Sequence, residues 1–516
     1  MVELRLRVLA AVIVLSTVAG IGSCGGFVIE EATIDAIQRG FRNGSLTSEK
    51  LVKFYLDRIN SAPYGQLRAV IEVNPDALQQ AKRADGERRS RGSRGRLHGV
   101  PVLVKDNIAT FDKLNTTAGS YALLGSAVRR DAGVVRRLRS AGAVILGKAN
   151  PSEWSNFRRV KAGWSARGGQ TLNPYNFLPT PCGSSAGPAV AAAANLAAVT
   201  LGTETDGSIL CPSSMNAVVG IKPTVGLTSR SGVIPISPRQ DSVGPICRTV
   251  SDAADVLDAI VGEDTLDKAT KAASKYIPRG GYRQFLKIDG LKGKRIGVPS
   301  AFFDARILDA NVLKVYEQHL STTRKLGANV ITGLNISINF TDLITQEHIA
   351  LAAEFKSSLN AYLSDLDWKN VPKKSTVRSL ADLIAFNKNN SKRENLMEFP
   401  QDQLIAAEKT KGTGAKEIIA AIKRLNEIST TGLEKLMKEQ KLDAILAPNN
   451  TASSILAVGG YPGIIVPAGY DSRGVPFGLC FGGLQGYEPR LIEMAYAFEQ
   501  ATKVRRPPPT PKRKLA

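Results

Sequence analysis

Two serine-containing stretches decide the interpretation of this chain: PCGSSAG at residues 181–187 and GTETDGS at residues 202–208. A run of small apolar residues separates them. Serines in such small-residue turns lie where the backbone can approach a substrate closely. A third stretch, VLVKDN at residues 102–107, places Lys105 at the end of an apolar strand pattern. Together the three stretches indicate a hydrolase that uses serine and lysine, without histidine.

The sequence around these stretches alternates between short apolar runs and helical patterns. Helices are expected at residues 132–141 and 186–194. Strands are expected at residues 100–104, 143–146, 196–201, 295–298, 444–447 and 463–466. This alternation predicts an α/β fold in which helices cover both faces of a central sheet.

Helical patterns occupy the N-terminal part of the chain. Two helices are expected within residues 30–62. Thr33 is positioned to cap the first helix, and Thr47 or Ser48 the second. A further helix is expected near residues 75–89.

The C-terminal half has a different character. Residues 302–440 are mostly amphipathic helix with many lysines, and we interpret them as an insertion packed over the sheet. The tail from Arg505 is basic and proline-rich, so an exposed arm is expected. The predicted organisation is a leader, one domain with a helical insertion, and a basic tail, at residues 1–25, 26–507 (insertion about 302–440) and 508–516.

The first residues have the layout of a secretory signal peptide. Arg5 and Arg7 precede an apolar run at residues 8–18, and small residues follow. Cleavage is expected between Gly20 and Gly26, and an anchor that is never cleaved is the alternative. The run is too short for a comfortable membrane-spanning helix. The protein is therefore expected in the secretory pathway, either secreted or in an endomembrane or vacuolar compartment.

Potential glycosylation sites fit that route. Asn115 and Asn449 lie near the motif-bearing strands, so poor access is expected there, whereas Asn335 and Asn339 are better candidates. The chain contains six Asn-x-Ser/Thr sequons, at Asn43, Asn115, Asn335, Asn339, Asn389 and Asn449.

The charge of the chain bears on its possible partners. The formal net charge is +22, but the excess is scattered and aromatic residues do not interleave with the basic clusters. We interpret it as a solvated basic surface, and no nucleic-acid partner is expected.

Four cysteines lie beyond the leader, and four buried thiols are preferred over one possible bridge. These are Cys182, Cys211, Cys247 and Cys480.

A serine nucleophile needs a base, and histidine does not supply it here. The three histidines, His98, His319 and His348, lie in no plausible triad motif and are assigned structural or surface roles. No paired-histidine or CxxC spacing indicates a metal, and no cofactor is expected. A lysine can act as the base when burial lowers its pKa. Lys105 is the candidate, although alone it would read as an ordinary lysine at a strand end.

These residues together resemble the amidase signature family. The resembling stretches are GVPVLVKDN at 99–107, CGSSAG at 182–187, GTETDGSI at 202–209, GIKPTVGL at 220–227 and GYPGIIVPAG at 460–469. The resemblance covers about residues 30–300 and 440–507. Within the family, SEWSNF at 152–157, GWSARGGQ at 163–170 and TDGS at 205–208 are similar to peptide amidases.

The resemblance implies a mixed, twisted central sheet and a Ser–cis-Ser–Lys triad. Ser208 would be the nucleophile, Ser184 the bridging serine on a cis peptide bond, and Lys105 the neutral base. Ser184 is chosen over Ser185 because the family separates bridge and nucleophile by 24 positions, as 208 − 184 does. Backbone N–H groups of the oxyanion hole would come from the turn before the nucleophile, at Thr205, Asp206 and Gly207.

Four positions depart from the family pattern. Ala186 and Pro188 replace the small polar or glycine residues that usually follow the bridging serines, and Leu210 stands where many relatives have arginine. Asp206 stands where most members have glycine, and peptide amidases accommodate an aspartate there. The changes at Ala186 and Pro188 leave open a weakened activity.

The resemblance implies an enzyme that hydrolyses carbon–nitrogen amide bonds, of peptide C-terminal amides or small carboxamides. Its partner is then a small-molecule or peptide substrate, without stable membrane insertion. Two alternatives stay open: an amidotransferase-type subunit that passes ammonia to a partner, and an inactive binding protein with the same fold. The sequence leaves the acyl group, the amine and the oligomeric state undetermined.

Overall fold

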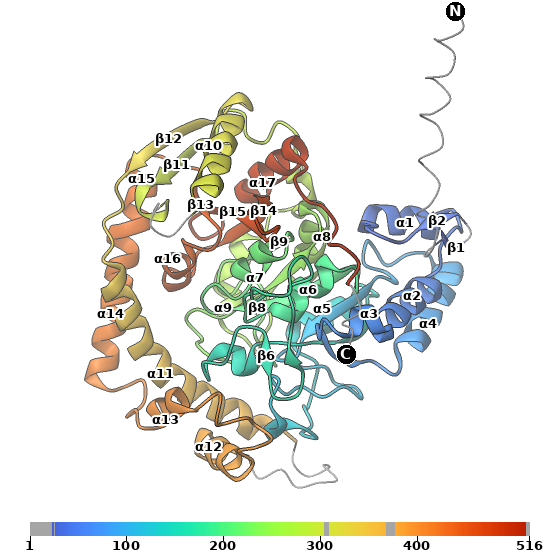
Figure 1. The fold of residues 1–516 in the computed structure, drawn as a ribbon, viewed down its shortest axis with the longest axis horizontal. Helices are drawn as coiled ribbons and strands as arrows, with labels where there is room; N and C mark the ends of the chain where they lie inside the picture. Colours follow the sequence, from blue (N-terminus) through green and yellow to red (C-terminus); the bar gives the residue numbers. More distant parts are fainter. Residues whose placement is uncertain (1–22, 25, 304–308, 368–376, 512–516) are drawn as a thin grey trace, which may run out of the picture.

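One large mixed sheet organises the molecule (Figure 1). A computed structural model describes residues 23–24, 26–303, 309–367 and 377–511. Eleven strands pair in the order β12-β11-β13-β15-β14-β9-β10-β8-β4-β5-β3, and helices flank them. The α/β fold expected from the alternating pattern is therefore confirmed.

The strands are short, as expected. Those of the large sheet are β3 Val70–Val73, β4 Pro101–Lys105, β5 Val144–Ala149, β8 Val199–Glu204, β9 Val219–Lys222, β10 Ser242–Cys247, β11 Arg295–Pro299, β12 Asn329–Leu334, β13 Ala444–Pro448, β14 Gly463–Tyr470 and β15 Pro476–Gly482. Two small hairpin pairs are β1 Ser23–Cys24 with β2 Phe27–Val28, and β6 Trp164–Ser165 with β7 Gly169–Gln170.

The helices surround this sheet. They are α1 Ile34–Arg42, α2 Ser48–Asn60, α3 Ala62–Gly65, α4 Ala77–Arg91, α5 Gly133–Ser140, α6 Ala186–Ala193, α7 Leu210–Met215, α8 Val250–Ile260, α9 Ala269–Ala273, α10 Ala310–Lys325, α11 Phe340–Asp365, α12 Leu380–Asn389, α13 Asp402–Glu408, α14 Lys416–Ser429, α15 Lys435–Glu439, α16 Ser453–Val458 and α17 Glu488–Thr502.

The N-terminal helices begin where their capping residues predict. The Thr33 side chain accepts a hydrogen bond from the backbone N–H of Ala36, and that of Thr47 from Lys50. Each threonine oxygen thereby satisfies an N–H group that the first helical turn leaves without a partner. Of the two candidate caps for α2, Thr47 is the one used.

Strands β4 and β8 lie side by side and parallel, with Leu103 opposite Thr200 and Val104 opposite Leu201. Every residue of both strands is buried. Their carboxyl ends consequently lie at the same edge of the sheet, which brings Lys105 close to the end of β8. Parallel strands covered on both faces carry just such continuous apolar runs.

The expected start of β8 is three residues too early. The apolar run begins at Leu196, but the backbone N–H of Leu196 donates to Ala191 and closes the end of α6. Asn195 before it is left-handed, with φ of 57°. The first apolar residues therefore end a helix, and the strand extends to Thr203 and Glu204, which the pattern had assigned to a turn.

The segment at residues 302–440 contains more than helices. It holds α10 to α15, but also β12, which pairs in parallel with β11 at one edge of the large sheet. The helical expectation missed this strand because three of its six residues are exposed, so it lacks a buried apolar run. Helices α11 and α14 pass along the side of the molecule away from α1 to α4 (Figure 1). That residues 302–440 form an insertion within one domain stays a prediction.

The start of the tail contacts the protein, although four of residues 505–511 are exposed as expected and residues 512–516 lie outside the described part. Arg505 pairs with Glu31, and the backbone of Arg506 forms hydrogen bonds with the hydroxyls of Tyr470 and Tyr175. Pro511 is buried. Two tyrosine hydroxyls and an acidic partner thus hold the first two residues of the tail, contacts that its composition did not predict.

The leader residues 1–22 lie outside the described residues. Within the part that is described, no helix combines the length and apolar character needed to cross a bilayer.

Candidate active site

Lys105 is the last residue of β4 and is completely buried. Its Nζ lies 2.7 Å from Ser184 Oγ, 2.9 Å from Thr203 Oγ1 and 3.3 Å from the Thr203 carbonyl oxygen. A neutral amine has two N–H groups and one lone pair. In the structure Nζ donates in all three contacts, to Ser184 Oγ and to both oxygens of Thr203. With its proton removed, the lone pair of the amine would face the Ser184 hydroxyl at the same distance.

Burial lowers the pKa of Lys105 to about 7, because desolvation disfavours the ammonium form. The negative charges of Asp241 and Glu204 act in the opposite direction but are weaker. No carboxylate forms an ion pair with Lys105 among the described residues. A substantial neutral fraction therefore exists near pH 7.

Ser184 and Ser185 lie at the start of α6 and have different partners. The peptide bond between Gly183 and Ser184 is cis. Ser185 Oγ donates to the Thr203 carbonyl and accepts from the Thr203 N–H, while its own N–H donates to the Ser208 carbonyl. Ser185 thus attaches the loop to β8, and Ser184 alone faces the lysine.

Ser208 follows the turn that leaves β8 and precedes α7; it is 8% exposed. Gly207 has a φ of 74°, a conformation that glycine adopts without steric penalty. Glu204 Oε2 accepts hydrogen bonds from the N–H groups of Ile209 and Leu210 and so fixes the start of α7. Leu210, one of the departures from the family pattern, packs in the core beside this turn.

The Thr205–Asp206–Gly207 turn is held by its side chains. Thr205 Oγ1 donates to Asp241 over 2.5 Å, and Ser454 Oγ donates to Asp206 Oδ2 over 2.7 Å. In the described part of the chain, the N–H groups of Asp206 and Gly207 donate to no other residue. They are therefore available to a substrate oxygen.

A buried carboxyl, Glu347 of α11, lies near Asp206. Its Oε1 accepts from Gln240 Nε2 over 2.5 Å. Burial, followed by the negative charge of Asp206, raises the pKa of Glu347 to about 8. Helix α11 belongs to the segment 302–440, so that segment reaches the turn before Ser208.

The two departures after the bridging serines are accommodated inside α6. Ala186 and Pro188 are both fully buried, and Pro188 lies in the first turn of the helix. A proline is tolerated there because the first turn leaves its N–H groups without helical partners.

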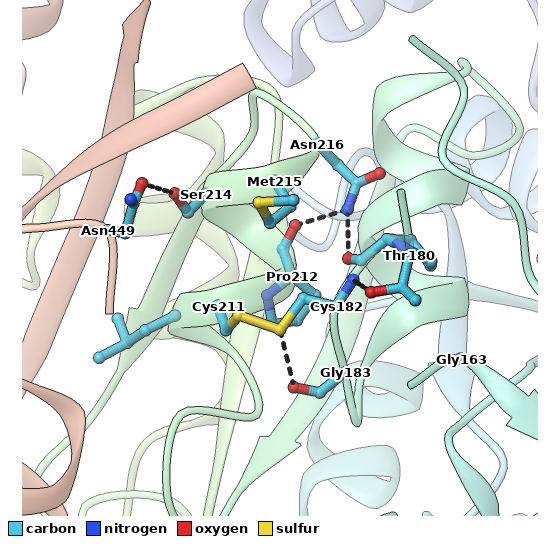
Figure 2. Close-up of a disulfide and its surroundings, with 12 residues drawn as sticks. Gly163, Thr180, Cys182, Gly183, Cys211, Pro212, Ser214, Met215, Asn216 and Asn449 are labelled. Carbon is cyan, nitrogen blue, oxygen red and sulfur yellow. Dashed lines mark hydrogen bonds between the residues drawn. A yellow bond between two sulfur atoms is a disulfide. The ribbon is translucent and has the colours of Figure 1, made fainter. Parts of the chain in front are cut away.

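The cysteines contradict the preference for four thiols. Cys182 and Cys211 form a disulfide with a Cα–Cα distance of 5.9 Å (Figure 2), whereas Cys247 and Cys480 are free and buried. Residues 29 positions apart meet because α6 and β8 return the chain to the same edge of the sheet. Sequence spacing carries no information about that return.

His98 and His319 lie outside this site. His348, next to Glu347 on α11, has a pKa that burial lowers, and it lies near enough to Asp206 for that negative charge to act on the same pKa. His98 is fully buried, and its Nδ1 accepts from the Arg94 N–H. His319 packs between the Ala468 carbonyl and the ring of Phe498. The residues that the structure describes include no cluster of three or more histidine, cysteine or acidic side chains able to hold a metal.

The glycosylation candidates differ in exposure. Asn115 and Asn449 are partly buried and use their side chains inside the protein, with Glu72 and with Ser214 respectively. Asn339 is exposed, and its side chain caps α11. The other exposed candidates are Asn43, Asn335 and Asn389.

Two side chains near the lysine were not singled out from the sequence. Thr203 Oγ1 receives hydrogen bonds from Lys105 and from Asn107 Nδ2, at 2.9 and 3.0 Å. Both residues lie inside the quoted motifs, so their presence was visible. Their contact depends on the pairing of β4 with β8, which the motifs do not state.

Comparison with known proteins identifies the family of this chain. A family model described as Amidase matches residues 50–492. A probable amidase of Arabidopsis thaliana is 56% identical over 490 residues, which cover 93% of this chain and 92% of that protein. A glutamyl-tRNA(Gln) amidotransferase subunit of Thermoanaerobacter pseudethanolicus is 31% identical, with 91% of this chain and 96% of that protein covered.

Solved structures extend the similarity to three dimensions. The native peptide amidase from Stenotrophomonas maltophilia is 44% identical and superposes with a TM-score of 0.86, covering 94% of this chain and 100% of that chain. An amidase family protein from Bacillus anthracis is 39% identical, with a TM-score of 0.85 and 93% of each chain covered. The chain belongs to the amidase family, and its resemblance to peptide amidases is confirmed.

Proposed function

We propose that this protein hydrolyses carbon–nitrogen amide bonds through an acyl-enzyme on Ser208. The observation that carries the proposal is the contact between Lys105 Nζ and Ser184 Oγ, 2.7 Å long, between two fully buried side chains. A neutral lysine held against a serine supplies a base where histidine is absent. Membership of the amidase family supports the same reaction.

The residues divide the work as follows. Lys105 accepts a proton from Ser184, and Ser184 takes the proton of Ser208, so that Ser208 Oγ bonds to the substrate carbonyl carbon. The carbon–nitrogen bond then breaks, and the proton held by Lys105 returns through Ser184 to the departing amine or ammonia. Water attacks the acyl-enzyme by the same route, which releases the carboxylic acid and restores Ser208.

The negative oxygen of the tetrahedral intermediate needs donors. The N–H groups of Asp206 and Gly207, which bond to no other described residue, support the assignment of the oxyanion hole to the Thr205–Gly207 turn. Asp206 bonds through its side chain to Ser454, which directs that carboxylate toward α16. This contact pairs Oδ2 of Asp206, whereas Oδ1 is buried without a hydrogen-bond partner among the described residues.

Peptide C-terminal amides or small carboxamides are the proposed substrates. Similarity to a peptide amidase over nearly the full length of both chains supports this class. The alternatives are an inactive binding protein and an amidotransferase-type subunit. The Lys105–Ser184 contact argues against the inactive form. Identity is higher to the Arabidopsis amidase than to the amidotransferase relative, which argues against the second alternative.

The decisive experiment measures ammonia release from a panel of amidated peptides and simple carboxamides. Wild type should release ammonia, and Ser208→Ala should reduce the rate to background. Ser185→Ala is the matched control, because Ser185 contacts β8 and not Lys105. Equal, negligible rates for wild type and Ser208→Ala across the panel would falsify the enzyme assignment.

We also propose that the protein enters the secretory pathway. The leader pattern, the disulfide and the exposed sequons Asn43, Asn335 and Asn389 support this. Expression in eukaryotic cells followed by glycosidase digestion should shift the electrophoretic mobility. Absence of a shift, together with retention of the leader by mass spectrometry, would contradict the proposal.

A further inference from the structure

The disulfide joins the two loops that carry the proposed serines. Cys182 lies two residues before Ser184, and Cys211 lies three residues after Ser208. The bridge therefore connects the start of α6 to the first turn of α7 (Figure 2). A covalent link at this place limits how far the two serine-bearing segments can move apart.

A second connection runs beside the disulfide. Asn216, which is fully buried, donates through Nδ2 to the Pro181 carbonyl over 2.9 Å and to the Pro212 carbonyl over 2.7 Å (Figure 2). One amide group thus spans the same two segments as the bridge. A backbone bond from Ser185 to the carbonyl of Ser208, 3.1 Å long, completes the connection.

The backbone of Cys182 explains why this loop needs to be held. Its φ is 59°, in the left-handed region that residues with a Cβ seldom adopt. Without the bridge, relaxation of Cys182 toward negative φ would move Gly183 and then Ser184. Both bridging cysteines are partly exposed, so a small reductant can reach them.

We propose that the Cys182–Cys211 disulfide, together with Asn216, is a clasp that positions Ser184 against Ser208, and that hydrolysis depends on its oxidised state. The cysteines and Asn216 are positioning residues, since none of them contacts Lys105. The inference rests on the proposed function of Ser208. Such a clasp confines activity to compartments that keep disulfides oxidised.

The chemical change is a two-electron reduction. A dithiol such as dithiothreitol attacks one sulfur as the thiolate, forms a mixed disulfide, and closes to its own cyclic disulfide. The protein gains two thiols, at Cys182 and Cys211, and the reductant is oxidised by the same two electrons. Removal of the reductant and addition of oxidised glutathione reverses the exchange.

The test compares oxidised and reduced wild type on one amidated peptide. On reduction we expect kcat to fall at least about tenfold, with KM changed less than about threefold, because misplacing a reacting group by about 1 Å costs about 10²-fold. Labelling of Ser208 by a fluorophosphonate should slow in parallel. Reoxidation should restore both rates, which loss of fold by aggregation would not allow.

Matched variants isolate the bridge. Cys182→Ser with Cys211→Ser should show the low kcat without reductant and should not respond to it. Cys247→Ala with Cys480→Ala removes the two free thiols and should respond to reductant as wild type does. If reduction unfolds the protein, Asn216→Ala tests the clasp instead, because this variant keeps the disulfide. It is expected to lower kcat and to leave KM unchanged.

The outcomes separate the two proposals. Oxidised protein that neither hydrolyses amides nor labels at Ser208 overturns the proposed function. If the oxidised protein is active, and the reduced protein shows two new thiols and equal activity, the clasp proposal is overturned. The proposed function then stands. A lowered melting temperature with unchanged kcat at 25 °C also overturns the clasp proposal, because the bridge then stabilises without positioning.

Discussion

Two buried lysines near the ends of neighbouring strands show what separates the proposed base from a structural lysine. Lys105 ends β4, and Lys148 lies in the adjacent parallel strand β5, opposite Val104. Both are fully buried, and desolvation lowers the pKa of both, to about 7 for Lys105 and about 8 for Lys148. Burial alone therefore does not distinguish them.

Their partners do. Lys148 Nζ donates to the Ile108 carbonyl over 2.6 Å and to Thr116 Oγ1 over 2.8 Å, and the negative charge of Asp106 opposes the effect of its burial. Lys105 faces Ser184, whose hydroxyl can give up a proton. Since Thr116 also offers a hydroxyl, the difference lies in where the hydroxyl stands: Ser184 belongs to the loop that the disulfide joins to the Ser208 segment, and Thr116 does not.

Replacing each lysine by methionine should give the largest contrast. Lys105→Met is expected to lower kcat/KM by about 10²–10⁴, the usual contribution of a general base. Lys148→Met should leave kcat within about tenfold but cost about 1–3 kcal/mol of stability, because acceptors in a buried site lose their donor. The measurements are steady-state kinetics and urea unfolding of both variants. Equal losses of kcat would remove the distinction between the two lysines.

The pH dependence of activity should follow Lys105 and not Lys148. Only the neutral amine accepts a proton, so kcat/KM should rise with pH through about 7, the pKa of Lys105. Below that value the rate should fall about tenfold per pH unit as the amine becomes protonated. A pH–rate profile of Lys148→Met should keep the same acidic limb. If the acidic limb shifts in Lys148→Met, the group that titrates is Lys148 on β5 and not Lys105 on β4.

Stability should respond to pH at both lysines. A lysine whose pKa is lowered in the folded state releases its proton on folding, so its contribution to stability falls as pH decreases from 10.5 toward the folded value. The expected loss is a few kcal/mol at most, at about 1.4 kcal/mol per pKa unit, and larger for Lys105. Urea unfolding between pH 7 and 9.5 should therefore show a steeper slope for wild type than for Lys105→Met. Parallel slopes would mean that Lys105 keeps an unshifted pKa.

The threonine beside each lysine offers the smallest and most selective test. Thr203→Val removes the hydroxyl that contacts Lys105 and should lower kcat about tenfold, since one hydrogen bond contributes about 1–1.5 kcal/mol. Thr116→Val removes the corresponding contact of Lys148 and should change stability by a similar amount with little effect on kcat. The measurements are kcat and the melting temperature of both variants. An effect on kcat from Thr116→Val alone would reverse the comparison.

Local patterns carried the prediction wherever the physical cause was local. The caps Thr33 and Thr47 are set by side-chain oxygens within three residues, and β4 by an unbroken apolar run. The start of β8 was misplaced because Leu196 is equally suitable for a helix end or a strand. Edge strand β12 was missed because its exposed residues give no apolar signal.

The contrast between the lysines was not visible before folding. Lys148 follows an apolar run as Lys105 does, and the serine motifs together with the family resemblance favoured Lys105. The disulfide was misjudged for a related reason, since its two cysteines meet only after α6 and β8 have formed. The contacts at the start of the tail were missed because proline-rich composition does not reveal the tyrosines that bind it.

The sequence by itself determined the α/β class, the residue types of the site and the 24-position spacing of its serines, because strand period, helix caps and motifs are short-range properties. The tertiary structure decided which lysine faces a serine, which cysteines pair and where the tail lies. Those contacts join residues far apart in the chain, and only the order of strands in the sheet brings them together.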